Sequence, residues 1–217
     1  MTSLPPLPSV PPVPPLSALP ESRRHQSAAH TIALVGVLAA IASAVRITTV
    51  GIAGVEAVFI VIIIGARVLG PRLGMLLGVA TIMVSSTITG GFGPWTLFQI
   101  LGLGVIGLGA GFLPHRIAKK PIRGWRELAL LAAYGILAAY FFGAFMNLWF
   151  WPVMVGPDTS LSFSPTATLS ENATRFAVFT FVTSTSTWDT VRAVTTAVGI
   201  ALVGQFMLRA LRRRAGH

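Results

Sequence analysis

The stretch LGMLLGVATIMVSSTITGGFGPWTLFQILGLGVIGLGAGFLPH, residues 73–115, decides the fold because no Asp, Glu, Lys or Arg occurs between Arg72 and Arg116. About 20 mostly apolar residues suffice for a helix to cross a lipid bilayer. The run GGFGP at residues 90–94 must break such a helix, since Gly and Pro are the strongest breakers. The stretch therefore predicts two membrane-spanning helices joined by a tight turn.

The rest of the chain has the same apolar character. Hydrophobic residues make up 53% of the 217 residues and charged residues only 10%, which is far too apolar for an ordinary soluble domain. Apolar runs occupy residues 29–45, 52–69, 73–89, 95–113, 128–150 and 185–208. Open strands would leave backbone groups unpaired in lipid, and the alternation of a membrane barrel is missing. We expect an all-α, multi-pass plasma-membrane protein with six transmembrane helices over residues 28–210.

The two ends of the chain are polar or proline-rich. The run at residues 1–20 holds eight of the fifteen prolines and lacks the basic start of a secretory signal. We predict a disordered cytoplasmic tail over residues 1–27 and a basic cytoplasmic tail over residues 211–217. A PxxP ligand for a partner domain is the alternative interpretation of the proline run.

Basic residues indicate the orientation, because they collect in cytoplasmic loops. The net charge of +10 is thus a topology signal, and we expect no nucleic-acid partner. With six spans, one side holds Arg23, Arg24, Arg67, Arg72, Arg116, Lys119, Lys120, Arg123, Arg126, Arg209, Arg212, Arg213 and Arg214. The other side holds Arg46, Arg175, Arg192, Glu56, Asp158, Glu171 and Asp189. We therefore predict that both termini are cytoplasmic (N-in/C-in) and that the 151–175 loop is outside.

The sequence offers little for catalysis. It has no cysteine, so disulfides, thiolate metal sites and Cys nucleophiles are excluded. Its histidines, His25, His30, His115 and His217, all fall in tails or at span ends. No GxSxG, HExxH or P-loop motif is present. We expect no catalytic residue, metal site or cofactor, and any uphill transport must draw its energy from a partner or an ion.

Polar residues near the predicted outer ends of the spans are the candidate binding residues. Arg192 lies about 10 Å past the start of the last span at 1.5 Å per residue, where facing lipid would be costly, so we expect it to face inward and to pair. The substrate-binding candidates are Trp95, Gln99, Asn147, Trp188, Asp189 and Arg192, with Arg46 and Glu56 as secondary ones. The alternatives are an intrahelical Asp189–Arg192 ion pair, tryptophans of an aromatic belt, and an Asn147 hydrogen bond between helices.

Small residues form a second pattern in the first span. Ala29, Ala33, Gly36, Ala40 and Ala44 recur at helical spacing, which lets another helix approach closely. Packing within the bundle and docking to another membrane subunit both fit this stripe.

Three features together resemble a known family: the small-residue stripe, the segment GPWTLFQ at residues 93–99, and WDTVRA at residues 188–193. The chain resembles the substrate-binding S component of energy-coupling factor (ECF) vitamin transporters, especially actinobacterial members grouped with the cobalamin type. This resemblance implies capture of a vitamin from outside and import driven by a transmembrane coupling (T) subunit and two cytoplasmic ATPases. It also implies that the stripe contacts the T subunit. The proline-rich tail departs from the family pattern.

Two other classes of function remain open. One is an assembly protein that packs against partner helices in membrane lipid and binds no small molecule. The other is a lipid-modifying enzyme that holds a phosphate with Arg116, Lys119, Lys120 and Arg123. For the transporter hypothesis, cobalamin or a precursor is the first expectation, with riboflavin, thiamine, biotin and queuosine precursors as alternatives.

Overall fold

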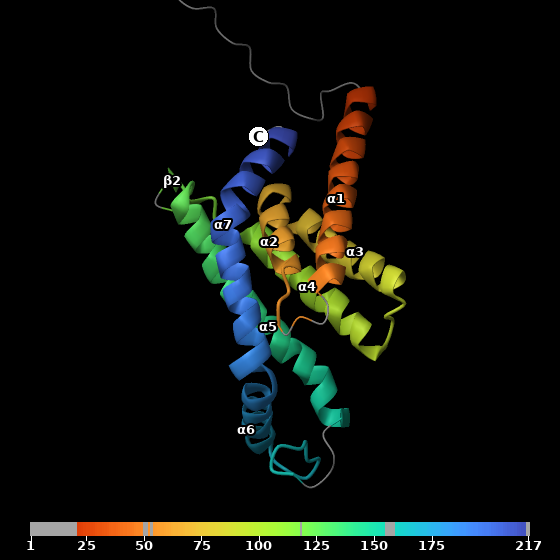
Figure 1. Cartoon of the computed structure of the whole chain (residues 1–217), viewed down its shortest axis with the longest axis vertical. Coiled ribbons are helices and arrows are strands. Elements are labelled where there is room, and N and C mark those ends of the chain that lie inside the picture. The colour runs from red at the N-terminus through yellow and green to blue at the C-terminus, as the bar shows by residue number, and fades with distance from the viewer. Residues whose placement is uncertain (1–20, 50–51, 53, 118, 155–158, 216–217) are drawn as a thin grey trace, which may run out of the picture. The chain divides into compact units, whose positions relative to one another are not determined.

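A computed structural model describes residues 21–49, 52, 54–117, 119–154 and 159–215 (Figure 1). The structure is 83% helical, which confirms the predicted all-α class. The chain divides into two compact units, Met1–Leu34 and Val35–His217, and every contact discussed below lies within the second unit. Most of the predicted proline-rich tail, residues 1–20, lies outside the described residues.

The elements follow one another along the chain with short connections. In order they are α1 (Glu21–Thr49), α2 (Val58–Leu69), α3 (Pro71–Thr89), α4 (Pro94–Phe112), β1 (Arg116–Ile117), β2 (Lys120–Pro121), α5 (Trp125–Met154), α6 (Leu169–Thr180), the π-helix η2 (Phe181–Asp189) and α7 (Thr190–Ala215). The antiparallel β1–β2 pair was not predicted from the sequence. It forms the turn between α4 and α5.

Five helical segments are long and apolar enough to cross a membrane: Ala28–Thr49, Pro71–Thr89, Pro94–Phe112, Trp125–Val153 and Leu169–Arg214. The predicted span at 52–69 is instead the 12-residue helix α2. Gly54 adopts a left-handed conformation (φ 71°), and the helix begins only at Val58. At 1.5 Å per residue, α2 is about 18 Å long, shorter than the ~30 Å hydrocarbon core.

The turn at residues 90–94 forms as predicted. Gly90 ends α3 in a left-handed conformation (φ 65°), which glycine adopts without strain. Pro94 occupies the first turn of α4, where its missing N–H costs nothing, and the Gly93 N–H donates to Thr96 Oγ1 (2.9 Å). The α3 and α4 helices pack closely where Gly74 faces Gly107. The absence of a side chain at Gly74 allows this, since a Cβ there would overlap the backbone of Gly107.

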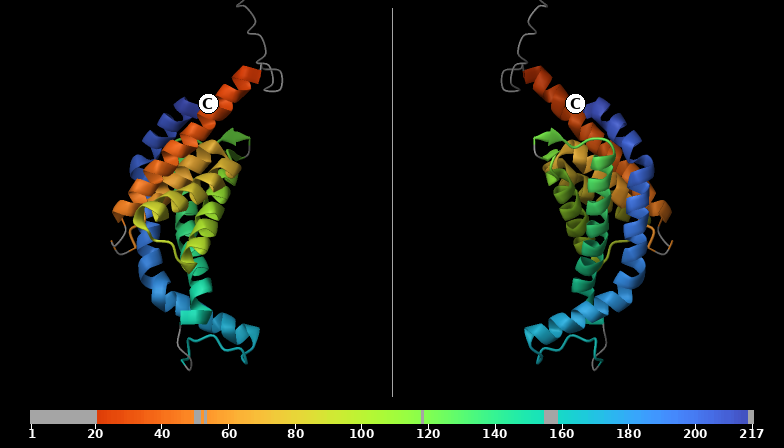
Figure 2. Two further views of the ribbon diagram at one scale, coloured as in Figure 1. Left: turned by 90° about the vertical axis from the view of Figure 1, so that its right-hand side faces the viewer. Right: turned by 90° about the vertical axis from the view of Figure 1, so that its left-hand side faces the viewer.

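The last span differs most from its prediction. It was expected over 185–208 after an outer loop at 151–175, but α5 continues to Met154 and helical structure resumes at Leu169. Thr168 caps α6 by accepting from the Glu171 backbone N–H (3.3 Å). From there α6, η2 and α7 run as one curved helix (Figure 2). The loop is therefore shorter than predicted, and Arg175 lies in α6.

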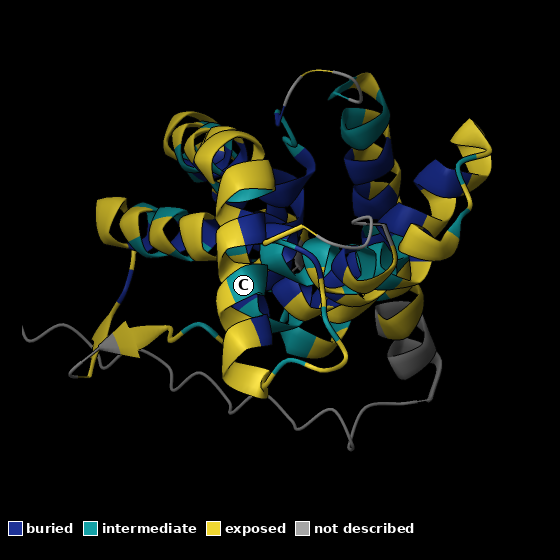
Figure 3. Ribbon diagram, turned by 90° about the horizontal axis from the view of Figure 1, so that it is seen from below, coloured by how far each residue is buried: buried dark blue, intermediate teal, exposed yellow. Residues whose placement is uncertain are grey.

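The core of the second unit is built around α2. Every residue from Val58 to Arg67 is buried, as expected for a helix with neighbours on all sides. Helices α3, α4, α5 and α7 all pack against it. In Figure 3 the dark blue residues lie where helices face one another, and the yellow exposed residues lie on the outward faces. Many exposed residues of α3, α4 and α7 are large and apolar, which suits a surface in lipid.

Candidate functional site

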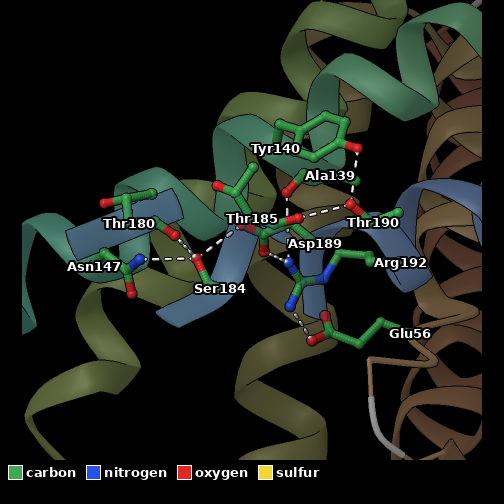
Figure 4. Close-up of polar contacts among 10 residues, drawn as sticks. All are labelled: Glu56, Ala139, Tyr140, Asn147, Thr180, Ser184, Thr185, Asp189, Thr190 and Arg192. Carbon is green, nitrogen blue, oxygen red and sulfur yellow. Dashed lines mark hydrogen bonds and ion pairs between the residues drawn. The ribbon is translucent and has the colours of Figure 1, made fainter. Parts of the chain in front are cut away.

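The centre of the candidate site is the buried side chain of Arg192 at the start of α7. Its Nη1 donates to Asp189 Oδ1 (2.6 Å) and its Nη2 donates to Glu56 Oε1 (2.7 Å). Asp189 is 1% exposed, whereas 35% of the Glu56 side chain is exposed. We call these three residues the substrate-side cluster (Figure 4). The predicted inward, paired arginine is thus present, and one of its two carboxylate partners lies 136 residues earlier in the chain.

Hydrogen bonds extend this cluster onto α5. Ser184 Oγ donates to Asp189 Oδ2 (2.9 Å) and accepts from Asn147 Nδ2 (2.8 Å). Asn147 therefore has the internal partner that a membrane amide requires. Figure 4 shows the resulting series of hydrogen bonds, which runs from α5 through η2 and α7 to the loop before α2. Its members in order are Asn147, Ser184, Asp189, Arg192 and Glu56.

The π-helix η2 positions the acidic end of the cluster. A π-helix has wider hydrogen-bond spacing than an α-helix and is frequent at functional sites. Thr190 Oγ1 donates to the Thr185 carbonyl five residues earlier (2.6 Å) and shares a hydrogen bond with Tyr140 Oη (3.1 Å). Gly143 of α5 leaves room for the Asp189 carboxylate, because a Cβ on Gly143 would overlap it.

Aromatic rings close the other side of the arginine. The Arg192 guanidinium carbon lies 5.3 Å from the ring centre of Phe142 and 5.8 Å from that of Phe59. Both distances fall within the range of cation–π attraction. The two rings contact each other edge to face at 5.4 Å. The guanidinium therefore binds two carboxylates and also lies within cation–π distance of two rings.

A cavity of about 360 Å³ lies beside this cluster. It is bordered by the end of α1, the loop before α2, and parts of α3, α4, α5 and η2. Its polar lining includes Arg46, Glu56 and Gln99, and its apolar lining includes Phe142 and Trp188. Arg46 Nη1 donates to Ser85 Oγ (3.0 Å) and its Nη2 to Gln99 Oε1 (3.1 Å). We call this space the substrate cavity.

Arg46 forms no ion pair in the described part of the chain, and the carboxylate that attracts its charge, Glu56, lines the same cavity without contacting it. The two hydrogen-bond partners of Arg46 are a hydroxyl and an amide. The substrate cavity therefore has a guanidinium whose charge is not matched by a contacting carboxylate. A ligand carboxylate or phosphate could supply the stronger, charge-assisted hydrogen bonds that this group can make.

A second cavity of about 340 Å³ also borders the cluster. Asn147, Ser184, Asp189 and Arg192 contribute its polar lining. Trp188 lines both this space and the substrate cavity. Members of the substrate-side cluster thus border both cavities: Glu56 lines the first, and Asp189 and Arg192 line the second.

Seven of the eight predicted site residues border one of these cavities. Arg46, Glu56, Gln99 and Trp188 line the substrate cavity, while Asn147, Trp188, Asp189 and Arg192 line the second one. Trp95 borders neither: it begins α4, is 42% exposed, and its ring covers Gly93. A binding role for Trp95 and its alternative as an interfacial anchor therefore both stay predictions.

Sequence reasoning missed several residues of the site. Ser85 is a hydrogen-bond partner of Arg46 and Ser184 one of Asp189, while Tyr140 bonds Thr190 beside the cluster. Phe59 and Phe142 are the rings near the Arg192 guanidinium. The only sequence signal for η2 was the run TSTST at residues 183–187, whose hydroxyls can bond within a membrane helix. Ser85 and Phe142 carried no signal that distinguished them from their neighbours.

The small-residue stripe of α1 lies on exposed surface. Ala29, Ala33, Gly36, Ala40 and Ala44 are all exposed, whereas Val35, Leu38, Ala39 and Ala42 are buried. A Cβ on Gly36 would meet nothing within 4 Å. Packing within the bundle therefore does not account for Gly36, Ala40 and Ala44, which belong to the same unit as the core.

A second buried cluster lies near the opposite ends of α2 and α7. Glu127 Oε1 accepts from Arg67 Nε (2.9 Å) and from Arg212 Nη2 (2.6 Å). Arg67 also donates to the carbonyls of Leu113 (2.6 Å) and Pro114 (3.1 Å). We call Arg67, Glu127 and Arg212 the basic-end cluster. Sequence reasoning missed it, because Arg67 and Arg212 were counted only as orientation signals.

Fold and site together define a multi-pass helical membrane protein with a small-molecule cavity between its helices. A comparison with protein families matches residues 30–207 to the family of the ECF transporter, substrate-specific component. The chain therefore belongs to this family. No curated protein and no solved structure matches the chain.

Membership of this family identifies the chain as a substrate-specific subunit of a transporter and not as an enzyme. It implies a small-molecule substrate and interaction with T and ATPase subunits. Together with the apolar helices, it places the protein in the plasma membrane as a multi-pass protein. The predicted class of protein is confirmed.

Proposed function

We propose that this subunit captures a vitamin or related micronutrient from outside the cell and hands it over for uptake driven by ATP hydrolysis in partner subunits. The chain has no P-loop of its own, so the energy must come from elsewhere. The proposed topology has six membrane segments, with the short helix α2 as one of them and both termini inside. The cluster of basic residues near β1, β2 and the end of α7 supports that orientation.

The observation that carries the proposal is the Arg46 side chain in the substrate cavity. Its guanidinium lines the cavity while bound only to neutral Ser85 and Gln99. A ligand carboxylate or phosphate would give the Arg46 guanidinium a charged hydrogen-bond partner. Glu56, partly exposed beside Arg192, can accept hydrogen bonds from donor groups elsewhere on the same ligand. The Trp188 and Phe142 rings offer apolar faces to a ring system.

The size of the cavity favours a compact ligand. Small-molecule sites have volumes of about 300–1,000 Å³, and the substrate cavity, at about 360 Å³, is near the lower end. Thiamine, biotin or a queuosine precursor suits such a volume better than the large corrin ring of cobalamin, and of these biotin carries a carboxylate whereas thiamine is a cation. We therefore propose a compact micronutrient with an anionic group ahead of the cobalamin that the family resemblance first suggested.

The α1 stripe is the proposed contact with the T subunit. Gly36, Ala40 and Ala44 are small and exposed on one helix, so a partner helix can approach the backbone closely. Ala29 and Ala33 continue the stripe towards the start of α1. An assembly protein without a ligand would need the same surface, but it would not need a cavity lined by Arg46, Glu56 and Gln99.

A thermal-shift screen of the full-length protein in detergent tests this proposal. The panel contains cobalamin, riboflavin, thiamine, biotin and queuosine precursors, and each acid or phosphate is paired with its neutral ester or unphosphorylated form. A ligand at 100 times its dissociation constant should stabilise the fold by about 2.7 kcal/mol. We expect a shift with an anionic compound and a smaller shift with its neutral counterpart.

Two outcomes of the screen would contradict parts of this proposal. If no compound shifts the melting of folded protein, the assembly-protein alternative is favoured. If cobalamin alone produces the shift, the volume argument for a compact ligand is wrong, while the assignment as a binding subunit stands.

A further inference from the structure

The β1–β2 pair joins α4 to α5 at the end of the second unit where α7 finishes (Figure 1). A cavity lined by basic residues lies there. Its volume is about 440 Å³. Four arginines line it, Arg67, Arg116, Arg123 and Arg212, together with His115. It shares no lining residue with the substrate cavity or with the second cavity beside Arg192.

The charges in this cavity are only partly compensated. Glu127 pairs with Arg67 and Arg212, so one carboxylate faces two guanidinium groups. Its buried Oε2 has no hydrogen-bond partner. Arg116 and Arg123 are exposed and form no ion pair among the described residues. Four arginines and one carboxylate leave three positive charges for an external anion.

His115 contributes a polar group and little charge. Burial lowers its pKa below the ordinary value, and the neighbouring Arg67 charge lowers it further. At neutral pH the ring is therefore mainly uncharged, so the arginines are the principal source of the positive potential.

An apolar cavity of about 450 Å³ adjoins the basic one. Pro121 and Ile122 line both spaces, and Trp125, Ala129 and Leu130 of α5 line the apolar one. Trp125 is 73% exposed and lies near Arg126, whose guanidinium carbon is 5.7 Å from the indole ring centre. A Trp with an apolar body and a polar edge is typical of the membrane–water interface.

We propose that this end of the protein binds an anionic phospholipid, with the phosphate in the arginine-lined cavity and an acyl chain over Trp125 and Leu130. Basic pockets between membrane helices are suited to anionic headgroups. The positive-inside rule explains why basic residues occur at this end, but it requires neither a concave site nor an apolar groove beside it. This inference is independent of the substrate proposed above.

Native mass spectrometry of the full-length protein in detergent tests the proposal. Phosphatidylglycerol and phosphatidylcholine with identical acyl chains are titrated separately. The variant R116Q/R123Q removes two cavity arginines from exposed positions, and R209Q/R213Q removes two exposed arginines of α7 that do not line the cavity. We expect the wild type and R209Q/R213Q to prefer phosphatidylglycerol, and R116Q/R123Q to bind it roughly tenfold more weakly.

Competition by soluble anions separates a lipid site from a phosphate site. Inorganic phosphate and glycerol phosphate at millimolar concentration should displace little phosphatidylglycerol, because they lack an acyl chain. Efficient displacement would overturn the lipid assignment in favour of a soluble anion. Equal binding of the two lipids by the wild type, or equal loss in both double variants, would overturn the site itself. Circular dichroism checks that every variant is folded.

Discussion

The substrate-side cluster and the basic-end cluster are both built from arginine–carboxylate ion pairs, but the numbers of arginines and carboxylates are reversed between them. In the first, one arginine, Arg192, lies between two carboxylates, Asp189 and Glu56. In the second, one carboxylate, Glu127, lies between two arginines, Arg67 and Arg212. Formal charges therefore leave the first cluster with a net charge of −1 and the second with +1.

The central ion pairs of the two clusters differ in how completely they are enclosed, and Arg212, the outer member of the basic-end cluster, is 30% exposed. The side chains of Arg67 and Glu127 are 0% and 1% exposed. The other two guanidinium nitrogens of Arg67, Nη1 and Nη2, donate to backbone carbonyls. Glu56, by contrast, is partly exposed and borders the substrate cavity. We infer that the basic-end ion pair fixes α2, α5 and α7 together, whereas the substrate-side cluster can exchange some of its contacts with a ligand.

Replacing Glu127 with alanine should have the largest effect on stability. The change leaves Arg67 buried without a counter-charge, and breaking a buried pair in this way costs about 3–5 kcal/mol. Detergent unfolding monitored by circular dichroism would measure the loss in the free energy of unfolding. An unchanged unfolding curve would contradict the structural role assigned to the basic-end cluster.

Gly143→Ala should destabilise the substrate-side cluster by an intermediate amount. The added Cβ would overlap the Asp189 carboxylate, and overpacking of this kind costs about 1–3 kcal/mol. Gly36→Ala is the matched control, because nothing lies within 4 Å of its added Cβ. Melting temperatures should fall for Gly143→Ala and stay level or rise for Gly36→Ala. Equal melting temperatures would show that α5 does not pack against Asp189 as described.

Glu56→Gln should change the free energy of unfolding least of the three substitutions. It tests whether the substrate-side cluster is less important for stability than the basic-end cluster. Asp189 still neutralises Arg192 in this variant, and a partly exposed ion pair contributes only about 0–1 kcal/mol. We expect a melting temperature close to that of the wild type and a measurable change in ligand affinity. A loss of stability as large as that of Glu127→Ala would mean that both clusters are structural.

Sequence patterns predicted the helix break and the ion pair within the last span for clear physical reasons. Gly and Pro at residues 90–94 permit only a turn, and the turn is there. Asp189 and Arg192 are three residues apart on one helix, so their pairing follows from helical spacing. Glu56 was a candidate because it is a carboxylate at a span end, but its pairing with Arg192 depends on the tertiary fold.

Other features could not be predicted from local pattern. The run at 52–69 is apolar enough for a span, yet the left-handed turn at Gly54 delays the helix until Val58. Trp95 and Trp188 both occur at span ends, and only the packing places one outside and the other inside the cavities. The Arg67–Glu127 pair joins α2 to α5 across 60 residues, a separation at which spacing carries no information.

The most direct test of the proposed substrate site is the affinity of the screened ligand for Arg46→Gln, measured by equilibrium dialysis beside wild type and the surface control Arg213→Gln. Loss of a charge-assisted hydrogen bond is worth about 1.5–3 kcal/mol, which is roughly 10- to 150-fold in dissociation constant. We expect this loss for Arg46→Gln at unchanged melting temperature and wild-type affinity for Arg213→Gln. Wild-type affinity in folded Arg46→Gln would contradict this expectation.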